Sequence, residues 1–481
     1  MAPMDITTLP LVIDLDGTLT PTDTLVESVA QLVKRNPLNI FRVLFWLLFA
    51  GGKAEFKQRV AENVGFSAIR LPWREDFIAW LRSQRDSGRQ IILATAAHES
   101  IATEVSRKLR LFDGVIATNG AANLKGAAKL AAIQELVGDR FAYAGDSRAD
   151  LAIWGSASTA ILVDVSRSTS KRAHHLAAVE KEFIYPAAST RVWLRALRVH
   201  QWIKNVLLLV PMCAAFAFYD LKKDAMVLLA ILAFSMAASA TYIMNDIWDL
   251  ASDRQHPRKR ARPFASGELS LLHGVGVAFA LLALAVILAW WISPQFGSML
   301  LAYIFLTTWY SWTLKKYVLI DVIMLAMLYT FRVLAGAVAT DIVLTPWLLA
   351  FCIFIFFSLA LVKRCAELVT LRESGKVGVH GRDYQVGDLA VLWPLGVGAS
   401  LCSVVVFGLY IGTPGAAMQY ANANVLWAVG IGLLYWISRL WIKTARGEMH
   451  DDPIVFAMRD AGCRITVILI AATVLFAHLI H

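Results

Sequence analysis

Hydrophobic residues follow two different patterns along the chain. Up to about residue 190, short apolar runs alternate with charged and polar positions, as in a soluble domain. From about residue 204 onward the apolar runs are each about twenty residues long, the length that a helix needs to cross a bilayer. The pattern therefore predicts a soluble domain followed by an all-α membrane domain. About nine spanning segments are predicted, at roughly 204–219, 225–244, 271–293, 297–314, 318–340, 345–362, 390–412, 423–441 and 463–480.

Within the soluble part, four apolar runs have the length and composition of buried strands. They are Leu11–Ile13, Gln90–Ala96, Gly114–Thr118 and Phe141–Ala144. Helical segments lie between them, and strands that alternate with helices form a parallel sheet. The chemistry of such a sheet takes place at the carboxyl ends of its strands. We therefore predict an α/β domain whose functional residues come directly after these strands.

Composition and charge support this division. The 481 residues are 58% hydrophobic and 17% charged, with a mean hydropathy of +0.57, which excludes an ordinary soluble enzyme of this size. Basic residues gather in the loops after the even-numbered segments, whereas the other loops hold few besides Lys222 and Lys223. The basic loop residues are Arg254, Arg258, Lys259, Arg260 and Arg262; Lys315 and Lys316; Lys363, Arg364, Arg372, Lys376 and Arg382; and Arg439, Lys443, Arg446, Arg459 and Arg464.

This charge asymmetry predicts the orientation of the chain. Cytoplasmic loops carry an excess of Lys and Arg, so the even-numbered loops and the N-terminal domain are expected in the cytoplasm. Nine crossings would then leave the C-terminus on the opposite side. We predict an integral protein of a bacterial cytoplasmic membrane. The net charge of +10 needs no nucleic acid to explain it, because topology and anionic substrates suffice.

An acidic motif ends the second predicted segment. Residues 245–253 have the pattern NDxxDxxxD, in which Asn245, Asp249 and Asp253 lie four apart on one face of a helix, with Asp246 beside it. Carboxylates this close at a membrane edge need a cation to neutralise them. Oxygen ligands alone favour Mg²⁺, which takes substrate phosphates as further ligands. The alternative is a solvated helix end, but the strongly basic stretch 254–262 that follows favours a phosphate site.

A set of polar residues follows the predicted strands of the soluble domain. In chain order these are Asp14 and Asp16, Thr95, Lys129 (with Lys125 a less favoured candidate), and Asp146 with Asp150. One carboxylate can attack phosphorus, and another two residues on can protonate the leaving oxygen and later activate water. Asp14 and Asp16 have this spacing. Thr95 and Lys129 would hold the phosphoryl oxygens, and Asp146 would complete a Mg²⁺ site with Asp14.

In this order the motifs resemble those of the haloacid dehalogenase superfamily of phosphatases. The resemblance implies a Rossmann-like domain over 1–165 with a small helical cap at about 22–75. It makes Asp14 the nucleophile and Asp16 the acid–base group. Magnesium would be held by Asp14, Asp16, Asp146 and Asp150. An inactive, degenerate domain is the alternative, which the presence of every required residue type disfavours.

The cap contains an unusually apolar stretch, Ile40–Ala50. It is too short to span a bilayer. The default interpretation is a buried core helix. An interfacial helix that leans the cap onto the membrane is the alternative, because Phe41, Phe45 and Trp46 are aromatic.

After a linker at 166–192, the domain at 193–481 resembles the UbiA superfamily of intramembrane prenyltransferases. The features that carry the resemblance are the NDxxDxxxD motif, the apolar segments and the basic loops. It implies an all-α fold with a cavity open to the cytoplasm and to lipid, in which Asp246, Asp249 and Asp253 bind Mg²⁺ and a diphosphate. Aromatic prenyltransferases also carry a second motif, DxxxD, after the fourth segment. Here only Asp321 is present at that place.

Other motifs stand in its place. They are residues 198–205, 256–263, Tyr310 with Lys315 and Lys316, residues 363–368, and His450-Asp451-Asp452-Pro453. Together they resemble the branch of decaprenyl-phosphate phosphoribosyltransferases, whose donor is phosphoribosyl diphosphate and whose acceptor is a polyprenyl phosphate. Such substrates carry several phosphates and demand many cations, whereas an aromatic acceptor needs far fewer.

The residues expected to bind these anions are polar or cationic groups at the predicted cytoplasmic edge. They are Lys204, Asn205, Asn245, Arg258, Lys259, Arg262, Tyr310, Lys315, Lys316, Arg332, Lys363 and Arg364. Singly, each cation could be a positive-inside anchor or a snorkelling side chain. As a set beside a Mg²⁺ site they fit a polyanion pocket better. His256 is expected to be a hydrogen-bonding loop residue rather than a ligand.

The sequence therefore predicts a bifunctional enzyme that requires Mg²⁺ in both domains. The membrane domain would transfer 5-phosphoribose to the lipid phosphate, and the phosphatase would remove the 5-phosphate from the product. An aromatic prenyltransferase fused to an unrelated phosphatase is the runner-up, and a regulatory or docking role for the N-terminal domain is a third alternative. Lipid chain length is open at this stage, and so is assembly into a homo-oligomer.

Overall fold

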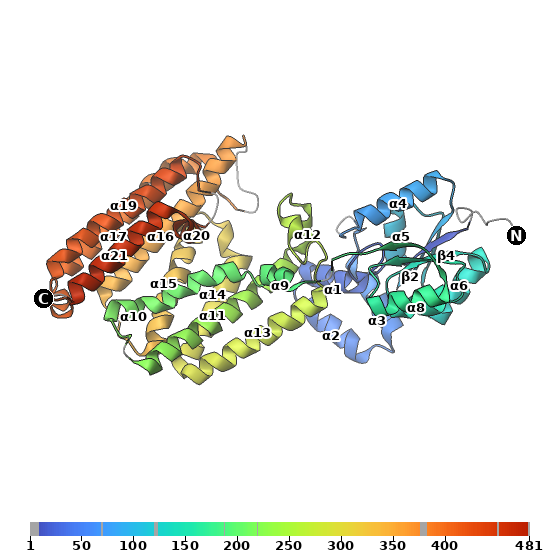
Figure 1. Cartoon of the computed structure of the whole chain (residues 1–481), viewed down its shortest axis with the longest axis horizontal. Helices are drawn as coiled ribbons and strands as arrows, with labels where there is room; N and C mark the ends of the chain where they lie inside the picture. Colours follow the sequence, from blue (N-terminus) through green and yellow to red (C-terminus); the bar gives the residue numbers. More distant parts are fainter. Residues whose placement is uncertain are drawn as a thin grey trace. The chain divides into compact units, whose positions relative to one another are not determined.

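The structure is a computed structural model that describes residues 9–68, 71–119, 124–186, 188–218, 220–375, 382–449 and 452–479. The chain divides into two compact units (Figure 1). The first comprises Met1–Leu197 and Tyr242–Ala278, and the second comprises Arg198–Thr241 and Phe279–His481. The α/β domain and the aspartate motif therefore belong to the same unit.

A parallel sheet of six strands in the order β3-β2-β1-β4-β5-β6 forms the centre of the first unit. The strands are β1 (Leu11–Ile13), β2 (Ile91–His98), β3 (Gly114–Thr118), β4 (Ala142–Gly145), β5 (Thr159–Val163) and β6 (Ala178–Phe183). All four predicted strands are confirmed within one or two residues. The central strand β1 is fully buried, and Ile13 pairs with Leu93 on one side and with Ala144 on the other.

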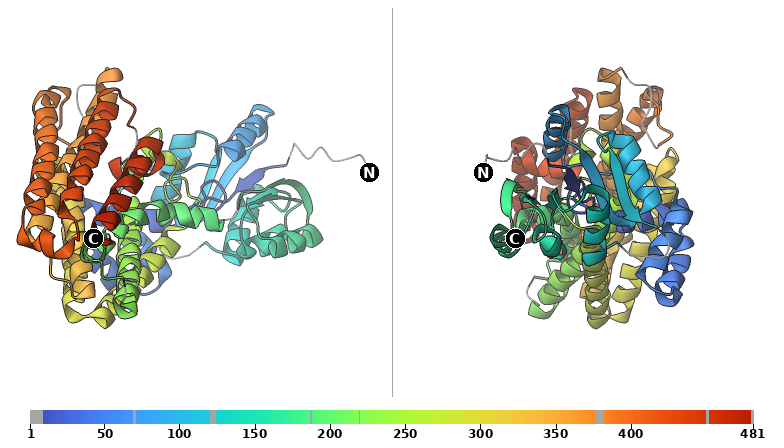
Figure 2. Two further views of the ribbon diagram at one scale, coloured as in Figure 1. Left: turned by 60° about the vertical axis from the view of Figure 1, so that its left-hand side comes forward. Right: turned by 90° about the vertical axis from the view of Figure 1, so that its right-hand side faces the viewer.

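Helices cover both faces of this sheet (Figures 1 and 2). Because side chains alternate along a strand, Leu11 and Ile13 face one core with Phe77, while Val12 faces another with Trp154. The first core is closed by α4 (Glu75–Asp86) and α5 (Glu99–Leu109). The second is closed by α6 (Ala127–Val137), α7 (Leu151–Trp154) and α8 (Arg167–Leu176).

The α/β domain extends beyond the predicted boundary at residue 165. Strand β6 pairs with β5 along its length, and α8 connects the two. The segment is thus a further βαβ unit of the same sheet, so the predicted linker at 166–192 starts too early. The linker interpretation failed because β6 is a half-exposed edge strand with three charged residues, Glu180, Lys181 and Glu182, and so lacks the apolar run of a central strand.

Three helices follow β1 and form the cap. They are α1 (Thr24–Arg35), α2 (Asn39–Phe49) and α3 (Lys53–Val64). Leu32, Val43 and Val64, one from each helix, form the small core of the cap. The default prediction of a buried core helix for the apolar stretch is wrong, because Val43 is the one buried residue of α2.

Seven helices in the described part of the chain are long and apolar enough to cross a membrane. They are α11 (Leu221–Trp248), α13 (Leu271–Ile292), α15 (Ile320–Thr340), α16 (Pro346–Glu373), α17 (Leu389–Ile411), α19 (Leu426–Ala445) and α21 (Ala461–Leu479). The shorter helices of this half are α9 (Thr190–Ala196), α10 (Val210–Ala215), α12 (Leu250–Gln255), α14 (Pro294–Trp312), α18 (Pro414–Gln419) and α20 (Pro453–Arg459).

Two of the nine predicted spans are not among these seven. The segment predicted at 204–219 is divided into a 3₁₀ stretch, η4 (Val199–Leu209), and the short helix α10. The segment predicted at 297–314 is the 19-residue helix α14, whose polar and aromatic residues make it less apolar than the others. Gly336 of α15 allows η4 to approach closely, because a Cβ there would lie 2.1 Å from the carbonyl oxygen of Leu208.

Candidate active sites

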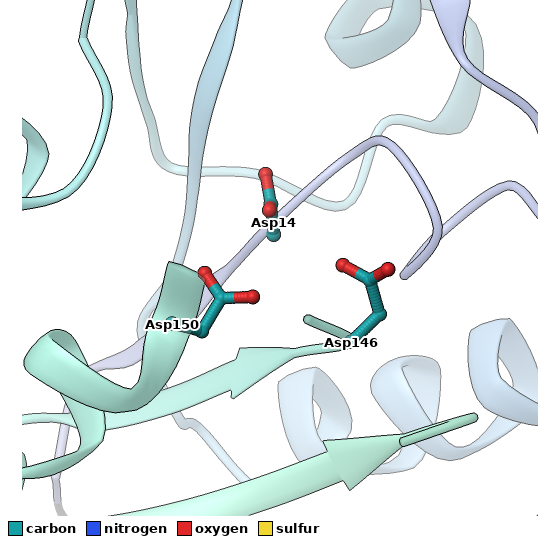
Figure 3. A group of neighbouring side chains, drawn as sticks. All are labelled: Asp14, Asp146 and Asp150. Carbon is teal, nitrogen blue, oxygen red and sulfur yellow. The ribbon is translucent and has the colours of Figure 1, made fainter. Parts of the chain in front are cut away.

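Three carboxylates meet at the carboxyl edge of the sheet. Asp14 follows β1 and Asp146 follows β4, and these strands are neighbours, so the fold brings the two side chains together. Asp150 joins them from a 3₁₀ turn at Arg148–Asp150. Figure 3 shows the three carboxylates beside one another, and one oxygen atom of each lies within 4.8 Å of the other two.

Gly17 allows this arrangement. Its φ is +78°, a left-handed conformation that favours glycine. A Cβ at this position would lie 2.1 Å from Oδ2 of Asp146, so a larger residue would push the carboxylate out of place. The hydroxyl of Thr18 donates to the other oxygen of Asp146 at 3.5 Å. The turn after β1 therefore forms a cradle that leaves room for an acidic side chain and a cation.

Lys129 contacts this site as the sequence analysis predicted. Its ammonium lies 2.9 Å from Oδ1 of Asp14 and also donates to the hydroxyl of Tyr143 at 2.7 Å. Tyr143 in turn donates to Asp150 at 2.8 Å, and Ser147 donates its backbone N–H and its hydroxyl to the second oxygen of Asp150. This buried network fixes the positions of Lys129 and Asp150. Tyr143 and Ser147 were not predicted, because a tyrosine within a strand gives no signal of a site.

The remaining predicted residues lie near by with different partners. The buried hydroxyl of Thr95 accepts the backbone N–H of Ala97 at 3.0 Å, at the end of β2. Asp16 accepts the backbone N–H of Thr24 at 2.8 Å, at the start of the cap helix α1. Asp16 is not part of the three-carboxylate group found among the described residues. Its place, between the sheet and the cap, suits proton transfer.

The electrostatics of the cluster fit a cation. Burial raises the pKa of Asp14, although Lys129 acts against it. Burial and the carboxylate of Asp23 raise the pKa of Asp16 to about 7, and burial with Asp14 and Asp150 raises that of Asp146 to about 8. Buried carboxylates in mutual contact disfavour their charged forms, and a divalent cation with oxygen preference would relieve this repulsion. The donor set therefore fits Mg²⁺.

A lysine of the cap also approaches this edge of the sheet. Lys57 of α3 donates to the carbonyl oxygen of Ala96 at 2.8 Å, next to Thr95. Burial lowers the pKa of the Lys57 ammonium, while the charge of Asp16 opposes this shift. Lys57 could not be selected from the sequence, because its helix has the pattern of an ordinary amphipathic segment. Its position makes it a cationic group that closes over the site from the cap.

We expect Lys57→Met to impair binding of a phosphorylated substrate more than the chemical step. The ammonium adds a positive charge facing the phosphate, whereas the reacting groups lie in the sheet domain. KM should rise by about tenfold with kcat changed less, since one lost charged contact costs on the order of 1–2 kcal/mol. Lys53→Met, at an exposed position of the same helix, is the matched control. A fall in kcat with unchanged KM would contradict this role.

The aspartate motif lies where α11 ends and α12 begins. Asp249 separates the two helices. Its backbone N–H donates to the carbonyl oxygen of Asn245 at 2.9 Å, and its own carbonyl oxygen accepts the N–H of Asp253 at 2.9 Å. The buried carboxylates of Asp246 and Asp253, two turns apart, share the guanidinium of Arg262 at 3.2 and 2.6 Å. Asn245 and Asp249 are half-buried beside them. These carboxylate oxygens are ligands of the kind that Mg²⁺ prefers.

The loop after this motif supplies further cations. Arg258 and Lys259 are exposed, and both donate their backbone N–H groups to Nδ1 of His256, at 3.2 and 3.3 Å. The interpretation of His256 as a hydrogen-bonding loop residue is thus confirmed. Arg262, which is partly buried, is the loop cation that contacts the aspartates.

In the second unit, two predicted lysines meet an aspartate. Lys204 of η4 and Lys363 of α16 lie 2.6 and 3.7 Å from Oδ2 of Asp452, which also accepts the hydroxyl of Tyr329 at 3.3 Å. Although burial acts in the opposite direction, the two ammonium groups hold the pKa of Asp452 below its usual value. Asp452 caps α20 by accepting the N–H of Ile454. Its neighbours in the motif, His450 and Asp451, are outside the described residues, as is Lys376.

A second polar cluster surrounds Arg332 in the middle of α15. Its guanidinium donates to Oδ1 of Asn205 at 3.1 Å and to the hydroxyl of Tyr303 at 2.5 Å. The amide of Asn205 donates to Ser235 at 2.9 Å. Arg332 and Asn205 were both predicted as site residues, and the structure brings them together. The hydrogen-bond partners of Arg332 among the described residues are neutral groups, so its buried positive charge favours the binding of an anion.

The third cluster joins predicted residues in an ion pair. Arg364, Asp321 and Tyr310 contact one another: Arg364 donates to both oxygens of Asp321, and Tyr310 donates to Asp321 at 2.8 Å. Glu367 accepts from Arg364 at 2.5 Å and from Arg382 at 2.9 Å. Asp321 and Arg364 are almost completely buried. Tyr310 and Arg364 therefore serve this network, and Asp321 is engaged by protein groups.

We expect Asp321→Asn to destabilise the protein by about 3 kcal/mol, because it breaks a buried ion pair and leaves the less buried Glu367 as the carboxylate partner of Arg364. Thermal unfolding of the purified protein in detergent measures this. Asp341→Asn, at the exposed end of the same helix, should leave the midpoint unchanged, because asparagine also adopts its left-handed conformation. Equal midpoints for both variants would mean that Asp321 carries no structural charge.

The predicted Lys315 and Lys316 lie in a 3₁₀ turn after α14. Lys315 is half-buried and Lys316 is exposed, with its carbonyl oxygen accepting the N–H of Asp383 at 3.0 Å. Asp452, Tyr329 and Tyr303 contact the predicted cations but were not among the predicted site residues. Asp452 could have been found, because its motif stood out in the sequence.

Comparison with known proteins agrees with both halves of this description. Residues 206–459 match the UbiA prenyltransferase family, and residues 11–153 match the haloacid dehalogenase-like hydrolases. The protein is thus an integral membrane protein with an N-terminal hydrolase-type domain, and its described residues include seven candidate spans. The chain belongs to the UbiA prenyltransferase family.

Three relatives show how far the similarity extends. The protein y4nM of Sinorhizobium fredii is 37% identical over 98% of this chain and 91% of its own length, so it covers both domains. Nodulation protein NoeC of Azorhizobium caulinodans is 34% identical over 59% of this chain and 92% of its own. Decaprenyl-phosphate phosphoribosyltransferase of Mycobacterium tuberculosis is 32% identical over 58% and 92%.

Proposed function

We propose that the membrane domain transfers 5-phosphoribose from phosphoribosyl diphosphate to a polyprenyl phosphate. We further propose that the N-terminal domain is a Mg²⁺-dependent phosphatase that removes the 5-phosphate, giving polyprenyl-phosphoryl-ribose. The similarity to a decaprenyl-phosphate phosphoribosyltransferase supports the first part. The cluster of Asp14, Asp146 and Asp150 with Lys129 supports the second.

The observation that carries the transferase proposal is the state of Asp321. It is the acidic residue nearest to the position of a second aspartate motif, and it is buried in an ion pair with Arg364. The chain therefore carries one aspartate motif, which contacts Arg262 in the first unit, and cationic clusters in the second unit, built around Lys204 with Lys363 and around Arg332. One acidic motif with several cationic clusters suits two anionic substrates better than it suits a diphosphate donor with a neutral aromatic acceptor.

The transfer would replace one bond at carbon one of the ribose. The bond to the diphosphate breaks, and an oxygen of the lipid phosphate forms the new bond from the opposite face. No general base is needed, because the lipid phosphate is already anionic at neutral pH. Magnesium held by Asp246, Asp249 and Asp253 would supply positive charge to the departing diphosphate. Arg262 is placed to stabilise the same charge, and Lys204, Lys363 and Arg332 would hold the other phosphates.

The phosphatase reaction would use the groups around Asp14. The Asp14 carboxylate attacks phosphorus and the bond to the ribose oxygen breaks, while Asp16 gives that oxygen a proton. Asp16 then takes a proton from the water that releases phosphate. Lys129 and Thr95 hold the phosphoryl oxygens. Bound magnesium would supply charge that lets the Asp14 carboxylate approach an anionic phosphate. Loss of the 5-phosphate would make the preceding transfer effectively irreversible.

One incubation tests the donor. Membranes that contain the protein are given phosphoribosyl diphosphate labelled in the ribose, with polyprenyl phosphate as acceptor. We expect label in the organic extract that depends on both the protein and the lipid phosphate. A parallel incubation with labelled polyprenyl diphosphate and 4-hydroxybenzoate tests the runner-up. Label transferred only in the second incubation would replace the phosphoribosyltransferase proposal with an aromatic prenyltransferase.

We also propose that the basic loops and the N-terminal domain face the bacterial cytoplasm. Ser374 and Asn422 lie on opposite sides of α17 in the chain, so the expectation does not depend on the total number of spans. In intact cells a membrane-impermeant maleimide should label Asn422→Cys but not Ser374→Cys, with the exposed Cys213 and Cys402 replaced by serine. Lysed cells, in which both sites should react, are the control. Labelling of Ser374→Cys alone would reverse the topology.

A further inference from the structure

Helix α2 of the cap exposes an apolar surface far larger than its neighbours do. Within and next to the helix, six large apolar side chains are each more than half exposed. They are Leu38, Phe41, Phe45, Leu47, Leu48 and Phe49. Single exposed apolar residues are common, but a contiguous patch of this kind marks an interaction surface. The ring centroids of Phe45 and Phe49 lie 4.8 Å apart, so these two side chains form a continuous part of the patch.

The inner side of α2 already has its partner. Val43 and Trp46, three residues apart, pack into the cap core with Leu32 and Val64. The helix is therefore fixed in orientation, and its outer face is directed away from the cap. Leu48 is the most exposed of these side chains, at 74%.

The charges around α2 suit an anionic lipid surface. The helix contains no acidic residue and one basic residue, Arg42, which is exposed. Lys34 and Arg35 precede it at the end of α1, and Lys53 follows it at the start of α3. A short apolar helix with basic flanks is the arrangement that binds in the interface of an anionic bilayer. With eleven residues the helix is too short to cross the bilayer.

The cap is also tied to a segment that enters the membrane. Glu27 of α1, which is 1% exposed, forms a two-pronged ion pair with Arg254 of α12 at 2.7 and 3.0 Å. Arg254 also donates to the carbonyl oxygen of Ala265 at 3.0 Å. Helix α12 directly follows α11, one of the candidate spans, with Asp249 between them. The helix that precedes α2 is therefore held at the end of a membrane span.

A second contact joins the two chain segments that connect the cap to the sheet domain with the loop that follows the aspartate motif. Gly267 has a φ of +80°, and a Cβ there would lie 2.4 Å from Pro21 and 3.4 Å from Pro72. Pro21 and Pro72 lie on the two chain segments that lead into and out of the cap, and Thr20 bonds to the carbonyl oxygen of Pro72 at 2.7 Å. The loop after the aspartate motif thus packs on both connections of the cap.

We propose that α2 lies in the interface of the lipid bilayer and that the phosphatase therefore acts on phosphates carried by membrane lipids. The occupant of the apolar face is the bilayer, because the neighbouring helix is fixed to a membrane span and the flanks of α2 are basic. Lys57 of the adjacent helix α3 contacts the carboxyl edge of the sheet, so the helix next to α2 also reaches the active site. The substrate class rests on the phosphatase function proposed above, whereas the position of α2 does not.

A depth measurement tests the position of α2. The full chain, with Cys213 and Cys402 replaced by serine, carries an environment-sensitive fluorophore at Leu48→Cys and is reconstituted into vesicles of phosphatidylcholine and phosphatidylglycerol. We expect strong quenching by lipids with a spin label on the acyl chain. The same fluorophore at Leu136→Cys, an exposed leucine of α6, is the matched control and should not be quenched. A Leu48→Cys probe that stays unquenched, in water or under another protein surface, overturns the proposal.

An activity measurement tests the substrate class. The variant Phe41→Ser, Phe45→Ser and Leu48→Ser should hydrolyse soluble p-nitrophenyl phosphate as the wild type does. Its rate on a lipid-linked phosphate in vesicles should fall by about tenfold, because the apolar contact with the bilayer is lost. The matched control replaces the exposed Leu136 and Leu176 of the sheet domain with serine and should keep both rates.

The outcomes separate this inference from the function on which it rests. Equal lipid rates in the wild type and the α2 variant refute the substrate class. Wild-type protein that hydrolyses p-nitrophenyl phosphate but no lipid-linked phosphate refutes both the lipid substrate and the proposed function, while the quenching still decides where α2 lies. If the α2 variant loses both rates, the cap has failed to fold, and the single substitution Leu48→Cys still tests the position through quenching.

Discussion

Asp14→Asn is expected to leave the transferase active and to stop the pathway at a lipid that still carries its 5-phosphate. Asp14 follows the central strand and contacts Lys129 at 2.9 Å, so it is the carboxylate placed to attack phosphorus. Asparagine has nearly the same shape but is a poor nucleophile. Phosphate release should fall by about a thousandfold or more. Mass spectrometry of the lipid product should show a species heavier by one phosphoryl group than the wild-type product.

The control for this experiment is Asp139→Asn, an exposed carboxylate of the same domain. It should give the wild-type lipid. If the wild type and Asp14→Asn accumulate the same phosphorylated lipid, the phosphatase acts on another substrate and the coupled pathway is wrong. If both accumulate the dephosphorylated lipid, Asp14 is not the nucleophile. Either result leaves the transferase proposal standing, because that reaction needs nothing chemically from Asp14.

The sequence could predict those strands that are followed directly by a residue of the phosphatase motifs. The central strands β1 and β4 are short buried runs that are followed directly by Asp14 and Asp146, so the motifs indicated where these strands end. A parallel sheet then followed from the alternation with helices, whereas the pairing of β1 with β4 is known from the structure. Strands β5 and β6 carry no motif, and β6 is an exposed edge, so nothing distinguished its residues from a polar linker.

Site residues that sequence reasoning missed act through contacts between distant parts of the chain. Lys57 reaches Ala96 from the cap, and Asp452 meets Lys204 across 248 positions. Neither contact could be predicted from residue spacing, although the motif at 450–453 did mark Asp452 as a candidate. The predicted arginines were easier to find, because a charge within a long apolar run needs a partner. The structure supplies those partners as Asn205 and Tyr303 for Arg332, and Asp321 for Arg364.

The predicted number of nine spans is not confirmed, because two of the predicted segments do not form a continuous, strongly apolar helix in the described part of the chain. The first predicted segment contains Lys204 and Asn205, which turn inward toward Asp452 and Arg332, and the backbone there is 3₁₀. This 3₁₀ stretch packs closely against Gly336 of α15. Apolar composition alone does not distinguish such an inward-packed segment from a helix that crosses the bilayer.

Asp253→Asn is expected to lower the transfer of labelled phosphoribose by about a hundredfold or more, since it removes charge from the group that stabilises the departing diphosphate. Asp253 is 2% exposed and accepts from Arg262 at 2.6 Å. Asparagine can still accept that hydrogen bond, so the loop should keep its fold. The variant should unfold at nearly the wild-type temperature and should no longer respond to added Mg²⁺ in the transferase assay.

Asp220→Asn, at the other end of α11, is the matched control. Asp220 is exposed and accepts the backbone N–H groups of Lys222 and Lys223, a capping role that asparagine fills equally well. It should transfer at the wild-type rate. Transfer by Asp253→Asn at that rate would overturn the assignment of Asp253 as a metal ligand. Conversely, loss of transfer with phosphatase activity on p-nitrophenyl phosphate intact would assign the defect to the aspartate motif, since the Asp14 cluster uses separate ligands.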